Sequence, residues 1–331
     1  MFTEALETPM VSIIIPVYQA KDTLRKCVES CLLQKEINPE DVEIILIDDG
    51  SCDGSEVICN QLSGAQNGIR VIVKHTKNQG VSVARNTGID LAKGRFVAFV
   101  DSDDEVTDTF LTNLLKHADE ATLLVDETNS FYSTQKISGF QYIENSILNE
   151  NTHVWGKIFD RKSLIDGNIR FPEKVAIGED LLFMLDVALL ADKRRCIRCI
   201  PDGDYIYNDN ENGAMNSALK RSYLDQILCW RRAEEKLLSV KNSLSPYAFV
   251  SVAVSQILTA LLVIGKVATQ TEKRDEELDK QAMTVSMEQI EHALKVRGSF
   301  AALSIGHKIK VMLLKYSPEL YLKLYAKHKG A

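Results

Sequence analysis

The sequence predicts an α/β protein with a parallel β-sheet in its first part and a helical C-terminal region. Strand-like and helix-like segments alternate through the first third of the 331 residues, as in successive βαβ units. The strand-like segments are continuous apolar runs, which is typical of strands that a parallel sheet buries on both faces. From about residue 222 onward the sequence is typical of helices.

The first segments predict a strand, a helix and a second strand. Residues 11–16 (VSIIIP) are expected to form a strand that ends at its proline. Residues 21–34 predict a helix with one apolar face, made of Leu24, Cys27, Val28, Cys31 and Leu32. Residues 42–47 (VEIILI) predict the second strand, and the helix after it should be capped near Asp53 or Ser55.

The next segments continue the same alternation. Residues 70–75 (RVIVKH) predict a third strand, and residues 81–94 (VSVARNTGIDLAKG) predict a helix that ends at Gly94. Residues 95–100 (RFVAFV) form another continuous apolar run and predict a buried strand. After about residue 120 the pattern weakens, and strands and helices are mixed.

Three of the predicted strands run into polar loops, which are Pro16-Val17-Tyr18, Asp48-Asp49-Gly50-Ser51 and Asp101-Ser102-Asp103-Asp104. In a parallel sheet these loops open on the same edge, where such sheets bind ligands. Crowded carboxylates are unfavourable unless a cation neutralises them, and Mg²⁺ and Mn²⁺ prefer oxygen ligands. The pattern predicts a metal–nucleotide site. The alternative is an acidic turn whose aspartates cap helices.

The composition is that of an ordinary soluble protein, with 45% hydrophobic and 26% charged residues. A net charge of -7 argues against binding to nucleic acid, which needs a basic surface. The 7 cysteines are scattered and odd in number, so we interpret them as reduced thiols, and the CxxC of Cys196 and Cys199 as part of a strand or turn. The segment MFTEALETPM lacks an apolar core, so we expect no signal peptide and a cytoplasmic protein.

Two C-terminal segments could each either contact a membrane or pack as part of the folded domain. Residues 246–265 are uncharged and long enough to span a bilayer, but polar residues interrupt them, which favours a buried helix over a membrane span. The tail from residue 305 interleaves lysines with apolar residues. Such a helix either lies on an anionic membrane surface or closes the domain as a solvated helix.

Taken in order, these motifs resemble the family-2 glycosyltransferases of the GT-A fold, particularly bacterial enzymes that build surface polysaccharides such as capsule and exopolysaccharide. The matching stretches are VSIIIPVYQA, EIILIDDGSCDGS, NQGVSVARNTGIDLAKGRFVAFVDSDD, VWGKIFDRKSL, GEDLLFMLDVALLA and YIYNDN. As an ordered set they are specific, although each alone is weak. Cys52 is a departure, because such sequences usually carry threonine or a similar small polar residue there.

The resemblance implies a glycosyltransferase domain over residues 1–220, with a nucleotide-binding half over 1–104 and an acceptor half over 105–220. Residues 221–331 would form the helical region, for which membrane association is one interpretation. The implied reaction is inverting transfer of a sugar from a nucleoside diphosphate, with UDP as the expected nucleotide, to a glycan or a lipid-linked acceptor. The enzyme would act in the cytoplasm, at the inner face of the cell membrane if the tail binds lipid.

The resemblance also implies a donor site made of Pro16, Tyr18, Asp49, Arg85 and Asp101. Tyr18 would stack on the base and Asp49 would accept a hydrogen bond from it. Arg85 would place a positive charge near the diphosphate or ribose, and Asp101 would contact ribose or metal.

Asn86 and Gly88 would shape the turn of chain beside that arginine. Asp103 would ligate Mn²⁺ or Mg²⁺, which bridges the two phosphates. Asp104 would either support the metal site or cap the next helix.

The resemblance makes Asp180 the catalytic base, since inverting transfer needs one carboxylate to deprotonate the attacking hydroxyl. Glu179 would orient the base or the acceptor. Trp155 is either a platform for the acceptor sugar or a buried structural tryptophan. Two other functions remain open: a metal-dependent nucleotidyltransferase, which would release pyrophosphate, and a non-catalytic homologue that binds a sugar or nucleotide.

Overall fold

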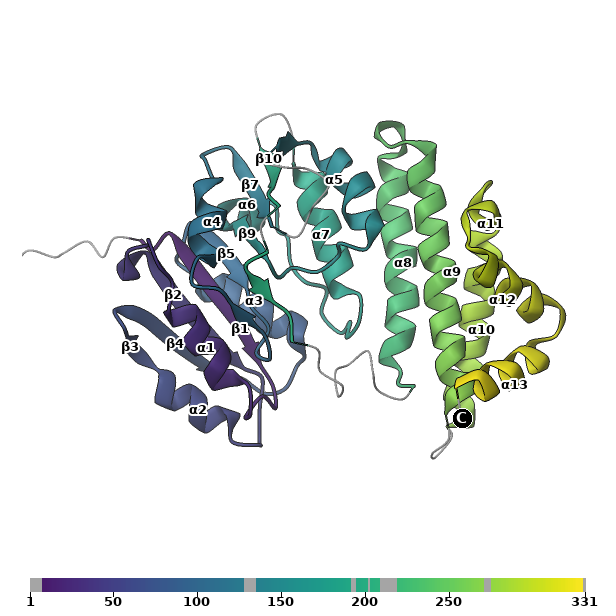
Figure 1. Ribbon diagram of the computed structural model, residues 1–331, viewed down its shortest axis with the longest axis horizontal. Coiled ribbons are helices and arrows are strands. Elements are labelled where there is room, and N and C mark those ends of the chain that lie inside the picture. The colour runs from purple at the N-terminus through teal and green to yellow at the C-terminus, as the bar shows by residue number, and fades with distance from the viewer. Residues whose placement is uncertain are drawn as a thin grey trace, which may run out of the picture. The chain divides into compact units, whose positions relative to one another are not determined.

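The computed structural model divides the chain into two packing units (Figure 1), which are Met1–Lys174 with Phe183–Asn210, and Val175–Leu182 with Glu211–Ala331. It describes residues 8–127, 135–191, 195–201, 203–208, 219–270 and 275–329. Residues 1–7, where no signal peptide is expected, and residues 209–210, which end the YIYNDN motif, lie outside these ranges.

A mixed β-sheet with strand order β3-β4-β2-β1-β5-β9-β7-β10-β8 forms the centre of the first unit. Its strands are β1 (Val11–Val17), β2 (Val42–Asp48), β3 (Gly64–Gln66), β4 (Ile69–His75), β5 (Phe96–Phe99), β7 (Thr122–Asp126), β8 (Gln135–Ile137), β9 (Lys157–Asp160) and β10 (Cys196–Cys199). A separate ribbon pairs β6 (Glu105–Val106) with β11 (Tyr205–Ile206). The cysteines are free thiols, and Cys196 and Cys199 lie on a strand as expected.

The prediction of a parallel sheet is confirmed for β4, β2, β1 and β5, which run parallel to one another. The rest of the sheet is mixed, because β9 pairs antiparallel with β5 and with β7. Strand β3 also pairs antiparallel with β4. The turn between them is Asn67-Gly68, and both residues have positive φ (51° and 83°), as the tight turn of a hairpin requires.

The predicted first strand differs from the observed one at its end. Strand β1 includes Pro16, which is in register with Ile47 of β2, and continues to Val17. Pro16 is tolerated because the pairing of β1 with β5 ends at Ile14, so no strand on that side needs a donor from residue 16.

The helices and 3-10 helices of the first unit cover the sheet (Figure 1). They are α1 (Leu24–Leu32), η1 (Pro39–Asp41), α2 (Ser55–Leu62), α3 (Val81–Leu91), α4 (Phe110–Lys116), α5 (Gly139–Asn145), η2 (Ile147–Asn149) and α6 (Arg161–Asp166). Helix α7 (Glu179–Leu190) contains the boundary between the units. The predicted apolar face of α1 is confirmed, since the same five residues are buried.

Helix α3 ends at Leu91, three residues before the predicted stop at Gly94. Gly94 serves close packing instead. A Cβ atom there would lie 2.6 Å from the backbone nitrogen of Ser12, so only glycine lets this loop approach β1.

The second unit is helical, as predicted. Its elements are α8 (Ser222–Ser239), η3 (Lys241–Ser243), α9 (Pro246–Thr269), α10 (Glu276–Ala293), α11 (Ser299–Ala302), α12 (Ile305–Tyr316) and α13 (Pro318–Lys329). Helices α8, α9 and α10 run side by side (Figure 1), and α9 also contacts α11, α12 and α13.

Among the described residues, one helix, α9, is long and apolar enough to cross a membrane by length and composition. However, 61% of its most apolar window is buried within the protein. Ile257, Ala260 and Ile264 lie in a core that includes residues of α10, α12 and α13. This packing favours the buried-helix interpretation of residues 246–265.

Candidate active site

The carboxyl ends of β2, β1 and β5 lie next to one another because these three strands are parallel neighbours in the sheet. The backbone N–H of Asp49 donates to the carbonyl of Val17 at 2.9 Å, which ties the loop after β2 to the end of β1. On the other side, the N–H of Val100 donates to the carbonyl of Ile14 at 3.1 Å. The prediction that the three polar loops open on one edge is therefore confirmed.

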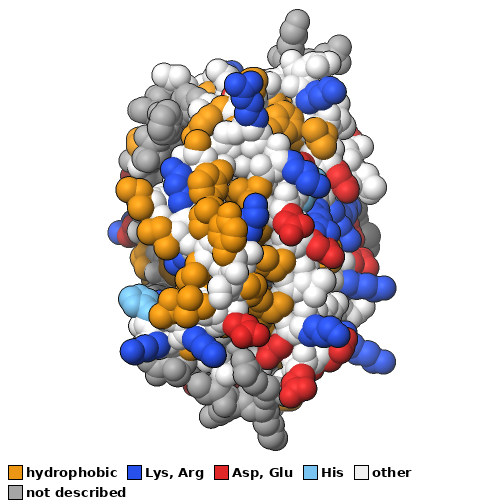
Figure 2. Space-filling view, turned by 90° about the vertical axis from the view of Figure 1, so that its right-hand side faces the viewer, with side chains coloured by type: hydrophobic (Ala, Val, Ile, Leu, Met, Phe, Trp, Pro, Cys, Tyr) orange, Lys and Arg blue, Asp and Glu red, His pale blue; other side chains and the backbone are white. Residues whose placement is uncertain are grey.

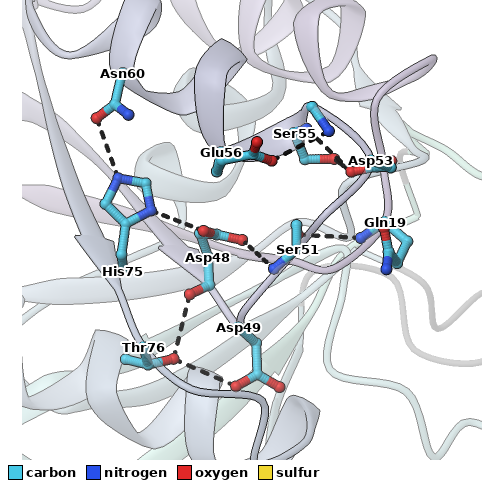
Figure 3. Close-up of polar contacts among 11 residues, drawn as sticks. Gln19, Asp48, Asp49, Ser51, Asp53, Ser55, Glu56, Asn60, His75 and Thr76 are labelled. Atoms are coloured by element: carbon cyan, nitrogen blue, oxygen red, sulfur yellow. Dashed lines mark hydrogen bonds and ion pairs between the residues drawn. The ribbon is translucent and has the colours of Figure 1, made fainter.

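The turn after β2 is held by a network of side chains (Figure 3). Asp48 is buried and accepts hydrogen bonds from the backbone N–H of Ser51 at 3.0 Å and from Nδ1 of His75 at 2.7 Å. The Ser51 hydroxyl in turn accepts from the N–H of Gln19 at 3.2 Å. Asp48 thus fixes the turn rather than pointing into open space.

Asp49 lies at the N-terminus of α3. Its carboxylate accepts hydrogen bonds from the backbone N–H groups of Gln79 at 2.9 Å and Gly80 at 2.7 Å, and from the Thr76 hydroxyl at 3.3 Å. The residue is only 3% exposed. The two N–H groups belong to the residues just before α3 (Val81–Leu91), and a carboxylate is favourable close to the partially positive N-terminal end of a helix.

Tyr18 directly follows β1 and is 53% exposed. An exposed ring next to the turn that carries Asp49 has the surface needed to stack on a flat base.

Arg85 projects from α3 and is almost completely buried. Its Nη2 lies 3.0 Å from Oδ1 of Asp101, and its guanidinium lies 5.2 Å from the centre of the Phe171 ring. Arginine suits this position because its planar group can stack on a ring and still donate at its edge.

Asn86 and Gly88 do not shape a turn, contrary to the prediction, because both lie within α3. Asn86 instead pairs with the backbone of Phe171 through two hydrogen bonds of 2.9 Å. A Cβ on Gly88 would lie 2.3 Å from Cγ2 of Ile14, so this glycine lets α3 pack directly on β1.

The acidic loop after β5 is held by hydrogen bonds from residues in and just after β11. The Tyr205 hydroxyl donates to Oδ2 of Asp104 at 2.6 Å and accepts from the N–H of Asp101 at 3.1 Å. The N–H of Asn208 donates to the other oxygen of Asp104 at 2.9 Å, and the Asn208 amide donates to the carbonyl of Asp103 at 2.9 Å. Asp104 therefore supports the loop, whereas helix α4 begins at Phe110 without a side-chain cap.

Electrostatics at this loop favour a bound cation. Burial raises the pKa of Asp104 to about 6, and the neighbouring carboxylates of Asp101 and Asp103 add to the effect. Among the described residues, no group of three or more His, Cys, Asp and Glu side chains is arranged to hold a metal ion. Mg²⁺, however, is commonly held by one or two carboxylates together with substrate phosphates and water. The oxygen donors of Asp101 and Asp103 fit that kind of site.

Trp155 lies beside β5, since it forms an isolated bridge with Phe99. His153 stacks on its ring at 3.6 Å and 13°, and Tyr205 stacks at 4.6 Å and 17°. Both rings are nearly parallel to the indole and close to it, so there is no room for both on one face. His153 and Tyr205 therefore cover opposite faces of the Trp155 ring. This favours the structural interpretation of Trp155. The ring left at the surface is Tyr207, which is 61% exposed and lies 5.9 Å from Trp155.

Sequence reasoning missed a buried polar cluster at the end of β7. Nζ of Lys157 lies 3.3 Å from Oδ1 of Asp126, and both side chains are fully buried. The Tyr142 hydroxyl and the Asn151 amide also donate to Asp126, at 2.5 and 2.9 Å. The next residue, Glu127, is 3% exposed, and burial raises its pKa to about 8.

A signal for this cluster is present in the sequence. Leu123, Leu124 and Val125 run into Asp126-Glu127, just as RFVAFV runs into the aspartates of the other acidic loop.

Glu179 and Asp180 form the first turn of α7 and belong to the second unit. The chain before them packs on α8, where the N–H of Ala176 donates to Asp225 at 3.3 Å. Gly178 has a φ of +96°, and a Cβ there would lie 2.9 Å from that of Cys229. A sharp glycine turn thus starts the helix, and carboxylates are favourable at this end of it.

Comparison with known proteins gives a consistent result. The family model described as "Glycosyl transferase family 2" matches residues 12–165. The chain is 29% identical over 245 residues to "Uncharacterized glycosyltransferase EpsJ" of Bacillus subtilis, covering 66% of this chain and 69% of that protein. It is 28% identical over 242 residues to "Succinoglycan biosynthesis protein ExoO" of Rhizobium meliloti, covering 67% of each.

Solved structures share the fold. The structure of residues 1–349 of S. aureus TarS in complex with UDP-GlcNAc superposes with a TM-score of 0.64 at 18% identity, covering 97% of this chain and 91% of that one. The mannosyltransferase PcManGT from Pyrobaculum calidifontis, in complex with GDP-Man and Mn²⁺, superposes with a TM-score of 0.50 at 16% identity, covering 97% and 86%. The predicted GT-A type sheet with flanking helices is confirmed.

Proposed function

We propose that this chain is a family-2 glycosyltransferase, an inverting enzyme that transfers a sugar from a nucleoside diphosphate to a hydroxyl of a glycan or lipid-linked acceptor. UDP is the proposed nucleotide, and the TarS complex with UDP-GlcNAc supports it. The proposed product is a bacterial surface polysaccharide, in keeping with the similarity to a protein named for succinoglycan biosynthesis. The proposed location is the cytoplasm, at the inner face of the cell membrane.

The observation that carries the proposal is the convergence of three polar loops at the carboxyl ends of β2, β1 and β5. At this edge Pro16 and the exposed ring of Tyr18 would border the base, and Asp49 would read it. Each carboxylate oxygen can accept more than one hydrogen bond, so Asp49 can bind the base while it accepts from the loop after β4. Arg85, fixed on α3, would hold the negative end of the donor.

Asp103, with Asp101 beside it, would hold a divalent cation, Mn²⁺ or Mg²⁺. When bound, the cation neutralises negative charge that develops on the leaving diphosphate. The pairing of Arg85 with Asp101 supports this assignment, because the arginine keeps one aspartate in place next to the other. Tyr205 and Asn208 hydrogen-bond to the backbone of the same loop, at Asp101 and Asp103.

Asp180 would act as the base. Its carboxylate would take the proton from the acceptor hydroxyl as that oxygen attacks the anomeric carbon, and the single displacement would invert the configuration. Glu179 would orient the acceptor or the base. On the acceptor side we assign contact with the sugar to Tyr207, whose ring is exposed, and assign Trp155 to holding the neighbouring rings in place.

Replacing Asp180 by Asn tests the proposal. We expect Asp180→Asn to lower kcat by about 10²–10⁴-fold, the usual contribution of a positioned base, while UDP binds as it does to the wild type. Asp166→Asn, on α6 and 65% exposed, is the control for loss of one carboxylate.

The assay measures UDP release and isothermal titration with UDP. Release of UDP rather than pyrophosphate separates sugar transfer from nucleotidyl transfer, and chelation by EDTA should stop it until Mn²⁺ or Mg²⁺ is restored. Near wild-type turnover by Asp180→Asn would exclude this residue as the base.

A further inference from the structure

Helices α12 and α13 differ in charge from the rest of the chain. Residues 304–329 contain six lysines and one glutamate, whereas the whole chain has a net charge of -7. This segment is therefore a basic region on an otherwise acidic protein, and anionic partners will be attracted to it.

The same helices carry a row of exposed apolar side chains. Ile305, Ile309, Met312 and Tyr316 follow one another at spacings of three and four residues along α12. At 100° per residue they lie within a stripe about 60° wide. Ile305 is 78% exposed and Tyr316 is 74% exposed.

Leu320 and Leu324 are exposed apolar residues of α13. We call these six residues, Ile305, Ile309, Met312, Tyr316, Leu320 and Leu324, the apolar face.

The apolar face is not the face that packs. Val311 and Leu314 of α12 and Tyr321 of α13 are buried in a core with residues of α9. Around the axis of α12, the buried residues point away from the apolar face. The helices thus close the domain with one side and present a second apolar side to solvent, which is unusual for surface residues that have no partner.

Lysines border the apolar face. Lys308 lines a shallow depression together with Ile309, Met312, Leu313 and Tyr316. Figure 2 shows hydrophobic side chains gathered on this side of the molecule, with Lys and Arg at their edges and Asp and Glu further to one side and below. Lys315 and Lys323 are exposed, whereas Lys308 is half-buried and its Nζ donates to the carbonyl of Ala301 at 2.8 Å.

We propose that the apolar face docks on an anionic lipid bilayer, with Lys308, Lys315 and Lys323 reaching the headgroups. The chemistry favours lipid over a protein partner for two reasons. Lysine side chains are long and flexible, so they can follow mobile phosphates while their apolar stems stay at the interface. Aliphatic residues with a tyrosine, on a helix that lies flat, form the usual interfacial anchor.

Binding of the full chain to vesicles tests this proposal without depending on sugar transfer. We expect sedimentation with phosphatidylglycerol vesicles, little with phosphatidylcholine vesicles, and loss of binding as salt rises. Neutralising Lys308, Lys315 and Lys323 to Gln should weaken binding about fivefold per lysine. Lys93, Lys162 and Lys280, which are exposed on other helices and loops, provide the matched triple control.

The apolar contribution has a closely matched control. Ile309 and Leu33 are both 61% exposed, and Leu33 lies at the end of α1 in the other unit. We expect Ile309→Asp to reduce vesicle binding at least tenfold and Leu33→Asp to leave it unchanged. Circular dichroism and UDP binding confirm that both variants are folded.

Three results would overturn the proposal. They are equal binding to both lipids, unchanged binding by Ile309→Asp, and a mass by light scattering that falls in Ile309→Asp while vesicle binding persists. The last result would make the apolar face a contact between copies of this chain. Inactivity of the wild type in the transfer assay would challenge the proposed function and leave this inference standing.

Discussion

Asp49 should stabilise the fold as well as the donor site, because its carboxylate anchors the loop residues that lead into α3. In Asp49→Asn, the amide oxygen can still accept from one of the N–H groups of Gln79 and Gly80, but its NH₂ group faces the other. The variant therefore loses one charge-assisted hydrogen bond and leaves one buried N–H unpaired. From these two effects we expect a loss of about 2–4 kcal/mol in the free energy of unfolding.

Asp53→Asn is the matched control. Asp53 also sits at a helix start, where it accepts from the N–H of Ser55 at 3.0 Å and from that of Lys21 at 3.0 Å. It is partly exposed, so water can replace what the amide loses, and we expect a loss of only about 0.5–1 kcal/mol.

Urea unfolding followed by circular dichroism measures stability, and titration with UDP measures binding. Because α3 also carries Arg85, Asp49→Asn should weaken UDP binding as well as stability. If Asp49→Asn unfolds at the same urea concentration as Asp53→Asn, Asp49 does not anchor the helix. Weaker UDP binding with unchanged stability would assign it to reading the base alone.

Two further predictions concern pH and packing. Glu127 has a pKa near 4.5 when unfolded and about 8 when folded, so the native state holds the extra proton and stability should fall as pH rises from about 5 to 8. Across this range, the free energy of unfolding should decline by about 1–3 kcal/mol less in Glu127→Gln than in the wild type, as measured by urea unfolding. Some decline should remain in the variant because the pKa of Asp104 is also raised. An equal decline in both proteins would refute the assignment. Gly88→Ala should lose about 1–3 kcal/mol, because the new methyl meets Ile14, despite the higher helix propensity of alanine. In Gly306→Ala no atom lies within 4 Å of the new methyl, so that variant should be at least as stable as wild type, and a similar loss there would contradict the packing argument.

The parallel part of the sheet could be predicted because its signals are local. The apolar runs of β1, β2, β4 and β5 and the face of α1 can be read from neighbouring residues, and their parallel order brings the polar loops to one edge. The hairpin of β3 and β4 also has a local signal in the sequence, the pair Asn67-Gly68. The antiparallel β9 had none, since its direction depends on where the chain re-enters the sheet.

The candidate site shows the same division. The aspartates after β5 stand out because they follow an apolar run, whereas the residues that support them do not. Tyr205 and Asn208 hydrogen-bond to Asp104 although they lie 101 and 104 residues after it in the sequence. The periodicity of a sequence does not predict contacts of this kind. A glycine at position 94 is typical of the end of a helix, but here it is needed because the loop passes close to the backbone of β1.

The hydroxyl of Tyr205 has a consequence for how the site assembles during folding. This hydroxyl joins Asp101 and Asp104 of the acidic loop to a strand about a hundred residues later in the sequence. The loop therefore reaches its final geometry only after that distant segment has folded against it. The stretch that matches the family model ends at residue 165, before that strand has begun. A fragment cut to that stretch would keep Tyr18, Asp49, Arg85 and both proposed cation ligands, yet lack the Tyr205 hydroxyl that bonds Asp101 and Asp104 and holds the acidic loop.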